Sequence, residues 1–248
     1  MIKKLFTNKA WAVSILFTIS LALYGIDFSL SGNLKEISAS FLGNLAFLPI
    51  YIIVVTLLFE RVLREKERES VMRKLNMVIG VFFSEFGNRL LRELSPCFTG
   101  LEEMKSRLLV TASWKEKDFS EALDYLEKSH LKVNIDVATL PHLKQFLAGK
   151  RNFLLSLLEN QNLLEHEAFT DLLWAAFHIT EELEARKSFD SMPHSDIEHI
   201  NGDIRRVYGY LIREWVLYML HLKQDYPYLF SLAVRLNPLI DEPDAVVY

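Results

Sequence analysis

The chain has 248 residues, is 50% hydrophobic and 24% charged, and carries a formal net charge of −4. Nine glycines and seven prolines exclude a collagen-like or linker-like chain. The single cysteine, Cys97, excludes an intrachain disulfide framework and a cysteine-rich zinc site.

Two apolar runs near the N-terminus predict a transmembrane helical hairpin within residues 1–59. Residues 10–26 and 37–59 contain no Asp, Glu, Lys or Arg. About 20 apolar residues of helix cross a bilayer core, so the second run is long enough and the first is at the short limit. A cleaved signal peptide is the alternative for the first run. We expect this run to be retained, because a second span follows at once and the cleavage pattern is poor.

Basic residues on both sides of the hairpin predict its orientation. Three lysines precede the first run, and a cluster follows the second run: Arg61, Arg64, Lys66, Arg68, Arg73 and Lys74. Positive residues stay on the cytoplasmic side of a membrane. We therefore expect a two-span protein of the cell inner (plasma) membrane with both termini in the cytoplasm. The six basic side chains are also candidates for contact with lipid headgroups.

Small and polar residues recur on one face of each predicted span. The candidates are Ser14, Thr18 and Ala22 in the first span, and Ser40, Gly43 and Asn44 in the second. Small faces let helices approach closely, which favours packing within the hairpin or between copies of the chain. The alternative is a pore lined by the polar residues of the second span. A charge at membrane depth, the usual mark of an ion path, is missing from both spans.

Residues 60–79 predict a charged helical stalk that continues the second span without Pro or Gly. Glu60 and Arg64 have the spacing of a helical ion pair. From residue 71 an apolar residue at every third or fourth position predicts a core-facing helix, which Pro96 ends.

Further periodic segments predict an all-α cytoplasmic domain over residues 80–240. The expected helices are 101–112, 118–128, 139–157, 165–187, 195–224 and 227–237. Ser195 and Glu198 have the spacing of a capping box. Residues 131–137 alternate apolar and polar side chains, which favours an extended linker or an edge strand without an identified partner. Residues 241–248 predict a flexible tail.

Motifs for common catalytic chemistry are missing, because the sequence has no phosphate-binding loop, zinc-protease motif or nucleophile elbow. We expect no cofactor, and we favour a non-catalytic role while leaving enzymatic activity open. Residues 60–248 hold 24 Lys and Arg against 30 Asp and Glu. This acidic excess argues against nucleic acid as a partner.

One polar constellation could bind a metal. Asp171, His178 and Glu182 share a face of one predicted helix, and His199 and Asp203 share a face of the next. Imidazoles and carboxylates on facing helices can hold metal ions. The alternatives are a solvated, salt-bridged surface and a polar interface with a partner.

Three segments together resemble uncharacterised prokaryotic two-span membrane proteins with a helical cytoplasmic domain. They are FFSEFGNRLLREL (82–94), EAFTDLLWAAFHITEELEAR (167–186) and EWVLYMLHLKQDYPYLFSLAVRLNP (214–238). The resemblance implies an architecture and no activity.

These features predict a membrane-anchored, non-catalytic module at the cytoplasmic face that binds a protein or small ligand. The expected partners are the lipid bilayer, further copies of the chain, and that protein or ligand. A second hypothesis is a homo-oligomeric two-span ion channel gated by the cytoplasmic domain. A third is a metal-dependent enzyme that uses the constellation around His178.

Overall fold

The computed structural model describes residues 2–31, 33–129, 131–160, 163 and 166–247, which are helical over most of their length. Within them it describes no side chain for residues 2–10, 12, 13, 30, 31, 34, 36 and 69. The chain divides into two compact units, residues 1–68 and 69–248. The helical content of the described residues supports the expected all-α fold class.

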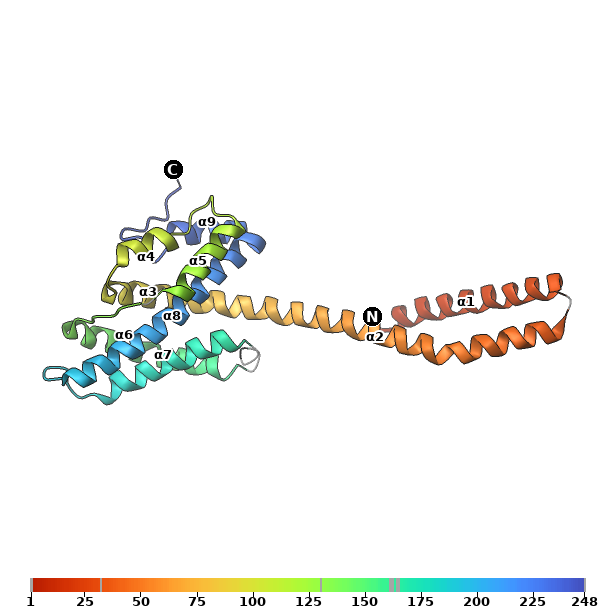
Figure 1. Cartoon of the computed structure of the whole chain (residues 1–248), viewed down its shortest axis with the longest axis horizontal. Helices are drawn as coiled ribbons and strands as arrows, with labels where there is room; N and C mark the ends of the chain where they lie inside the picture. Colours follow the sequence, from red (N-terminus) through yellow and green to blue (C-terminus); the bar gives the residue numbers. More distant parts are fainter. Residues whose placement is uncertain (1, 32, 130, 161–162, 164–165, 248) are drawn as a thin grey trace. The chain divides into compact units, whose positions relative to one another are not determined.

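The N-terminal unit contains helix α1, Ile2–Ser31, and the first part of helix α2, Leu34–Phe82 (Figure 1). Among the described residues, one helical run, Ile37–Cys97, has the length and composition to cross a membrane. Its most apolar window has a mean hydropathy of 2.3 and no buried residue. The apolar stretch in α1 is shorter, Ser14–Ser29. One qualifying run is weak evidence by itself, so the two-span hairpin stays a prediction.

The residues predicted to pack the hairpin are all exposed. The Thr18 hydroxyl donates to the Ser14 carbonyl oxygen of its own helix at 2.8 Å. A Cβ at Gly43 would meet no heavy atom within 4 Å. The ring of Tyr24 contacts the ring of Phe41 edge-on, with centroids 6.3 Å apart. Close packing through small residues, within the hairpin or between copies, therefore stays a prediction.

The six basic residues of the predicted headgroup cluster are also exposed. Arg64 lies 3.5 Å from Glu60, which confirms the ion pair predicted from their spacing, and Arg61 lies 3.7 Å from Glu65. Both pairs are solvent-exposed, so each contributes little to stability.

The C-terminal unit begins with the end of α2 and continues through short and long helices (Figure 1). These are a π-helical turn at Phe83–Gly87, α3 (Asn88–Leu94), a 3₁₀ turn at Ser95–Cys97, α4 (Leu101–Leu108), α5 (Glu116–Lys128), a 3₁₀ turn at Val137–Thr139, α6 (Leu140–Leu158), α7 (Glu167–Ala185), α8 (His194–Asp225) and α9 (Pro227–Arg235).

Helix α8 lies at the centre of this unit. It packs against α3, α5, α7 and α9, and its fully buried side chains include Tyr208 and Trp215. The apolar stripe predicted from residue 71 onward also enters the core, with Leu75, Phe82 and Phe86 buried. The helical periodicity of the sequence therefore identified the core-facing side of the segment from residue 71 onward.

Two local expectations need correction. Helix α8 begins after Pro193, whose carbonyl oxygen accepts the first backbone bonds from Asp196 and Ile197. The capping box expected from Ser195 and Glu198 is wrong, because the helix begins one residue before Ser195 and proline takes the cap position. Helix α4 ends at Leu108 rather than at residue 112, and Leu109 already leaves the helical conformation.

The alternating segment 131–137 has a partner after all. Val133 forms an isolated antiparallel bridge with Phe98. The backbone N–H of Thr99 donates to Lys132 at 3.0 Å, and that of Asn134 donates to Cys97 at 2.9 Å. The side-chain oxygen of buried Asn201 accepts from Ile135 at 3.1 Å, which ties this segment to α8.

The C-terminal residues make two polar contacts with the helices. Lys105 donates to Asp241 at 2.5 Å, and Arg235 donates to the carbonyl oxygen of Ala245 at 3.0 Å. The flexibility expected for residues 241–248 stays a prediction.

Gly87 gives a test of core packing. A Cβ at Gly87 would lie 2.6 Å from the ring of Phe83 and 2.9 Å from the ring of Phe82, both fully buried. We expect Gly87→Ala to lower the free energy of unfolding by about 1–3 kcal/mol through overpacking.

The matched control is Gly149→Ala, on the exposed side of α6, where a Cβ would meet nothing within 4 Å. It should raise stability by about 0.5–1 kcal/mol, the helix preference of Ala over Gly. Urea unfolding of the full chain in detergent measures both. Equal effects of the two substitutions would contradict the packing at Gly87.

Candidate functional site

The candidate site lies between α7 and α8, which pack against each other along the C-terminal unit (Figure 1). Both helices bury an apolar face, represented by Leu172 and Leu183 on α7 and by Ile200 and Ile204 on α8. At the edge of this contact, polar residues replace the apolar ones. Four of them meet, two from each helix, and we name them the α7–α8 cluster: His178, Glu182, His199 and Asp203.

The polar atoms of the α7–α8 cluster converge on a small space. The Nε2 atoms of His178 and His199 lie 3.5 Å and 3.4 Å from Oδ2 of Asp203. The two oxygens of Glu182 lie 3.9 Å from His178 Nε2 and 3.6 Å from His199 Nε2. One donor atom each from His178, Glu182 and His199 lies within 4.8 Å of the others. The geometry therefore brings two imidazoles and two carboxylates together.

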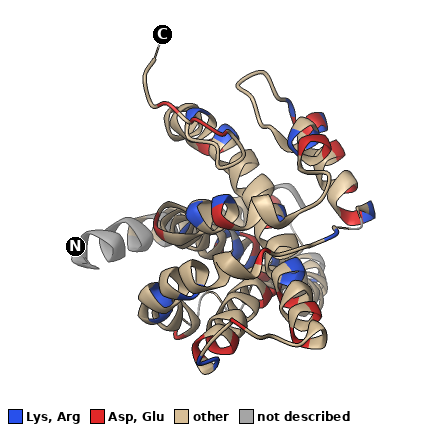
Figure 2. Cartoon of the chain, turned by 90° about the vertical axis from the view of Figure 1, so that its left-hand side faces the viewer, with Lys and Arg blue, Asp and Glu red and all other residues tan. Residues whose placement is uncertain are grey.

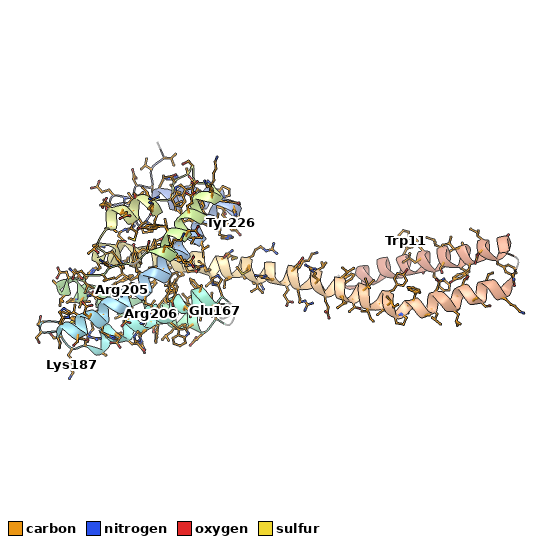
Figure 3. All side chains as sticks on the ribbon, viewed as in Figure 1. Trp11, Glu167, Lys187, Arg205, Arg206 and Tyr226 are labelled. Carbon is orange, nitrogen blue, oxygen red and sulfur yellow. The ribbon has the colours of Figure 1, made fainter. Side chains whose placement is uncertain are left out.

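Asp203 is the buried member of the cluster. Its side chain is 3% exposed, whereas the side chains of His178 and His199 are 45% and 50% exposed. Its Oδ1 atom accepts a hydrogen bond from Arg206 Nη1 at 2.9 Å, and Figure 3 labels Arg206 on α8. Its Oδ2 atom is buried and has no hydrogen-bond partner among the described residues. This oxygen therefore faces the two imidazoles as a hydrogen-bond acceptor without a donor.

Arg186 holds the other side of the cluster in place. It donates to Glu182 Oε2 at 2.7 Å and to both carboxylate oxygens of Asp196 at 2.6 Å and 3.2 Å. These charge-assisted bonds hold the pKa values of Glu182 and Asp196 below their usual range and raise the pKa of Arg186. Glu182 is therefore ionised at neutral pH.

The structure places the five sequence candidates unequally. It brings donor atoms of His178, Glu182 and His199 within 4.8 Å of one another and places Asp203 within 3.5 Å of both imidazoles, but Asp171 is exposed and belongs to neither set. Asp171 precedes His178 by two helical turns, which is about 10 Å along the axis and beyond the reach of an aspartate. Shared helix face alone does not bring two side chains together.

Sequence reasoning did not identify Arg186 and Asp196 as part of the site. The spacing of Glu182 and Arg186 is the i,i+4 spacing of a helical ion pair and could have suggested one bond. Asp196 lies in the first turn of α8, across the connection from Arg186. Only the packing of α7 on α8 shows that one guanidinium serves both carboxylates.

Other buried titratable groups lie away from the cluster. Burial raises the pKa of the Cys97 thiol, which lowers its reactivity. Burial also raises the pKa of Glu214, which lies 3.4 Å from Arg213. On the face seen in Figure 2, acidic and basic residues are interspersed along the helices. The expectation that nucleic acid is not a partner stays a prediction.

Comparisons with known proteins show the family. Residues 71–235 match the C-terminal helical domain of the uncharacterised protein MJ1433, and residues 3–63 match its N-terminal helical domain. MJ1433 of Methanocaldococcus jannaschii is 38% identical over 239 residues, which covers 94% of this chain and 96% of that protein. The chain therefore belongs to the MJ1433 family of uncharacterised proteins. No solved structure matches it.

The family relationship supports the architecture and gives no activity. The boundary between the two matched helical domains falls between residues 63 and 71, and the boundary between the two compact units falls at residues 68 and 69. The matches to MJ1433 confirm the expected likeness to an uncharacterised prokaryotic helical protein. The family descriptions do not mention a membrane.

Arg186 gives a test of the electrostatics of the site. We expect Arg186→Ala to lower the free energy of unfolding by about 2 kcal/mol at pH 7, because two ionised carboxylates lose a largely buried hydrogen-bond donor. The pKa values of Glu182 and Asp196 are lower in the folded protein than in the unfolded chain. Their ion pairs with Arg186 therefore stabilise the fold fully above the unfolded pKa values near 4, and this stabilisation is lost as the pH falls through the folded pKa values. The difference from wild type should therefore shrink below about pH 4.

The control for Arg186→Ala is Lys187→Ala, an exposed neighbour labelled in Figure 3. It should change stability by less than about 0.5 kcal/mol at every pH. Urea unfolding of the full chain in detergent from pH 3 to pH 8 gives both values. If Arg186→Ala lowered the free energy of unfolding equally at every pH, the proposed pairing of Arg186 with two ionised carboxylates would be contradicted.

Proposed function

We propose that this protein is a membrane-anchored, non-catalytic helical module whose C-terminal unit lies at the cytoplasmic face and binds a protein or small ligand. The observation that carries the anchoring is the exposed apolar surface of the N-terminal unit. The most apolar window of the Ile37–Cys97 run has no buried residue. In the C-terminal unit, by contrast, residues of the same types form a buried core.

This exposed surface includes large side chains on both helices. On α1, Trp11, labelled in Figure 3, and Leu16 are 70% and 66% exposed. On α2, Leu42 and Tyr51 are each 67% exposed. Apolar surface costs about 25 cal/mol per Å² in water, and soluble monomers rarely expose continuous apolar patches above a few hundred Å². Lipid removes this cost, and a helix satisfies its own backbone hydrogen bonds there.

The length of α1 supports its role as the first span of the hairpin. Its uncharged part, residues 10–26, is short, but the whole helix has 30 residues. At about 1.5 Å per residue it extends about 45 Å, more than a bilayer core of about 30 Å. Both spans of the proposed hairpin are then long enough, with their charged ends in the interfacial regions.

The proposed role of the C-terminal unit is binding rather than catalysis. This unit has its own core, and the α7–α8 cluster leaves its histidines half exposed at the surface. The sequence holds no motif of a common catalytic chemistry. A self-contained domain with an accessible polar cluster and no such motif supports recognition of a ligand or partner.

A pair of double variants tests the anchoring. Leu45 and Leu48 are 50% and 48% exposed, and Val62 and Leu63 are 50% and 58% exposed. If both segments lay in water, aspartates at either pair of positions should therefore change the free energy of the protein by about the same amount. In a bilayer, Leu45→Asp with Leu48→Asp places charges near the centre of the span, at about 3 kcal/mol each. The pair Val62→Asp with Leu63→Asp places them beyond the predicted end of the span at residue 59.

We expect wild type and the Val62/Leu63 double variant to stay with membranes after washing with alkaline carbonate. The Leu45/Leu48 double variant should lose at least half of its membrane-bound fraction. Release of the wild type by the wash, or equal retention of both double variants, would refute the anchor. Conductance of the wild type in planar bilayers would favour the channel hypothesis instead.

A labelling experiment tests the orientation. Lys35 lies in the predicted external loop and Arg64 in the predicted cytoplasmic segment, and both are exposed. In intact cells, a membrane-impermeant maleimide should label Lys35→Cys, and it should label Arg64→Cys only after permeabilisation. The unaltered chain is the control, since Cys97 is buried. The reverse labelling pattern would indicate the opposite orientation in the membrane.

A further inference from the structure

We propose that the α7–α8 cluster binds one divalent first-row transition-metal ion through its two imidazole nitrogens and two carboxylates. This names a ligand for the binding module proposed above, but it rests on the C-terminal unit alone. The argument uses the types of the donor atoms, their spacing, the unpaired oxygen of Asp203 and the charge of the surroundings.

The donor set selects the class of ion. Two histidine nitrogens with two carboxylate oxygens suit Zn²⁺, Co²⁺, Mn²⁺ and Fe²⁺. Mg²⁺ and Ca²⁺ prefer oxygen ligands alone. Cu⁺ prefers sulfur, and Cys97, the one cysteine of the chain, is buried next to Phe98, outside the cluster. A borderline divalent ion therefore fits best.

The spacing of the donor atoms is close to that of a coordination shell. With metal–ligand distances of about 2.0–2.1 Å, two ligands of a tetrahedral ion lie about 3.3–3.4 Å apart. The distances from Asp203 Oδ2 to the two imidazole nitrogens are 3.4 Å and 3.5 Å. Those from Glu182 are 3.6 Å and 3.9 Å. The donor atoms of His178, Glu182 and His199 lie within 4.8 Å of one another, so side-chain rotation would have to bring them, and Asp203, closer around the ion.

The same distances are long for direct hydrogen bonds. A charge-assisted N–H···O bond is about 2.7–2.9 Å long, and the four nitrogen–oxygen distances of the cluster exceed this range. Direct pairing between histidine and carboxylate therefore explains the arrangement poorly.

The unpaired oxygen of Asp203 points to a ligand independently of the spacing. Asp203 is almost completely buried, and its Oδ2 atom has no hydrogen-bond partner among the described residues. A buried polar atom without a partner costs about 1–3 kcal/mol, and more when it is charged. Arg206 already occupies Oδ1, so Oδ2 is left for a cation held between the imidazoles.

The charges around the cluster also favour a cation. Glu182, Asp196 and Asp203 face the guanidinium groups of Arg186 and Arg206, which leaves one negative charge when the histidines are neutral. Arg186 is occupied by two carboxylates, so it fixes Glu182 in place rather than competing as a free charge. Such outer contacts orient the ligands of metal sites. The bound ion would cross-link α7 to α8.

Metal titration of the full chain tests the proposal. Protein without a histidine tag is purified in detergent, dialysed against a chelator and then against buffer, and titrated with ZnCl₂ in a calorimeter. We expect one equivalent to bind and to raise the unfolding temperature. Titration with Co²⁺ should produce visible absorption with the same stoichiometry.

Two variants assign the binding to the cluster. His199→Gln and Asp203→Asn should each weaken Zn²⁺ binding at least tenfold and abolish the thermal shift. His142→Gln is the matched control, because His142 is similarly exposed and lies 3.2 Å from the carboxylate of Glu93 on another part of the unit. It should bind Zn²⁺ like the wild type.

The outcomes decide the proposal clearly. Less than 0.2 equivalents bound by the wild type, or unchanged binding by His199→Gln, would overturn it. If circular dichroism shows that Asp203→Asn does not fold, His199→Gln decides alone, because its side chain is half exposed. The titration does not depend on membrane insertion, so release of the protein by carbonate would leave this result unaffected.

Discussion

The packing of α8 is the constraint on which the C-terminal unit depends. This helix lies against α3, α5, α7 and α9, and its buried residues contact each of them in turn. The hydroxyl of Tyr208 lies 3.1 Å from that of Ser95, and its ring stacks obliquely on Phe98 at 4.1 Å. Contacts on several sides leave α8 little freedom to rotate about its axis, because close-packed cores tolerate few alternative arrangements.

This fixed rotation determines the polar chemistry at the edge of α7 and α8. Ile200, Ile204 and Val207 face the core, and Asp203 lies between them in sequence on an adjoining part of the same surface. The carboxylate is therefore carried inward, while His199, one turn earlier, stays half exposed. Burying such a group with an incomplete set of hydrogen bonds lowers stability relative to an apolar residue. Arg206 satisfies one oxygen of this aspartate, and the proposed metal ion would satisfy the other.

The sequence predicted what depends on one helix and missed what depends on two. Periodicity located most helices, and the i,i+4 spacing placed His178 with Glu182 and His199 with Asp203. It could not show which helices would be neighbours, so the double role of Arg186 was invisible. Asp171 was included because it shared a face with His178, although the axial distance excluded it.

Other misses have the same origin in tertiary context. Trp174 is large and apolar, yet it is 56% exposed, because the core-facing side of α7 is set by its packing on α6 and α8. The partner of segment 131–137 lies more than thirty residues earlier in the chain. Neither fact follows from a local pattern.

The two units present opposite surfaces, and this contrast links the two proposals. The described N-terminal helices expose their large apolar side chains, whereas the C-terminal unit buries most of its own in a core. In the proposed anchoring, lipid would cover the first surface and water the second. A site in the C-terminal unit would then act in the thin aqueous layer beside a membrane, where tethering raises the effective concentration of membrane-bound partners. An ion that cross-links α7 and α8 would stiffen the surface that such partners meet, so metal occupancy and partner binding would be thermodynamically coupled.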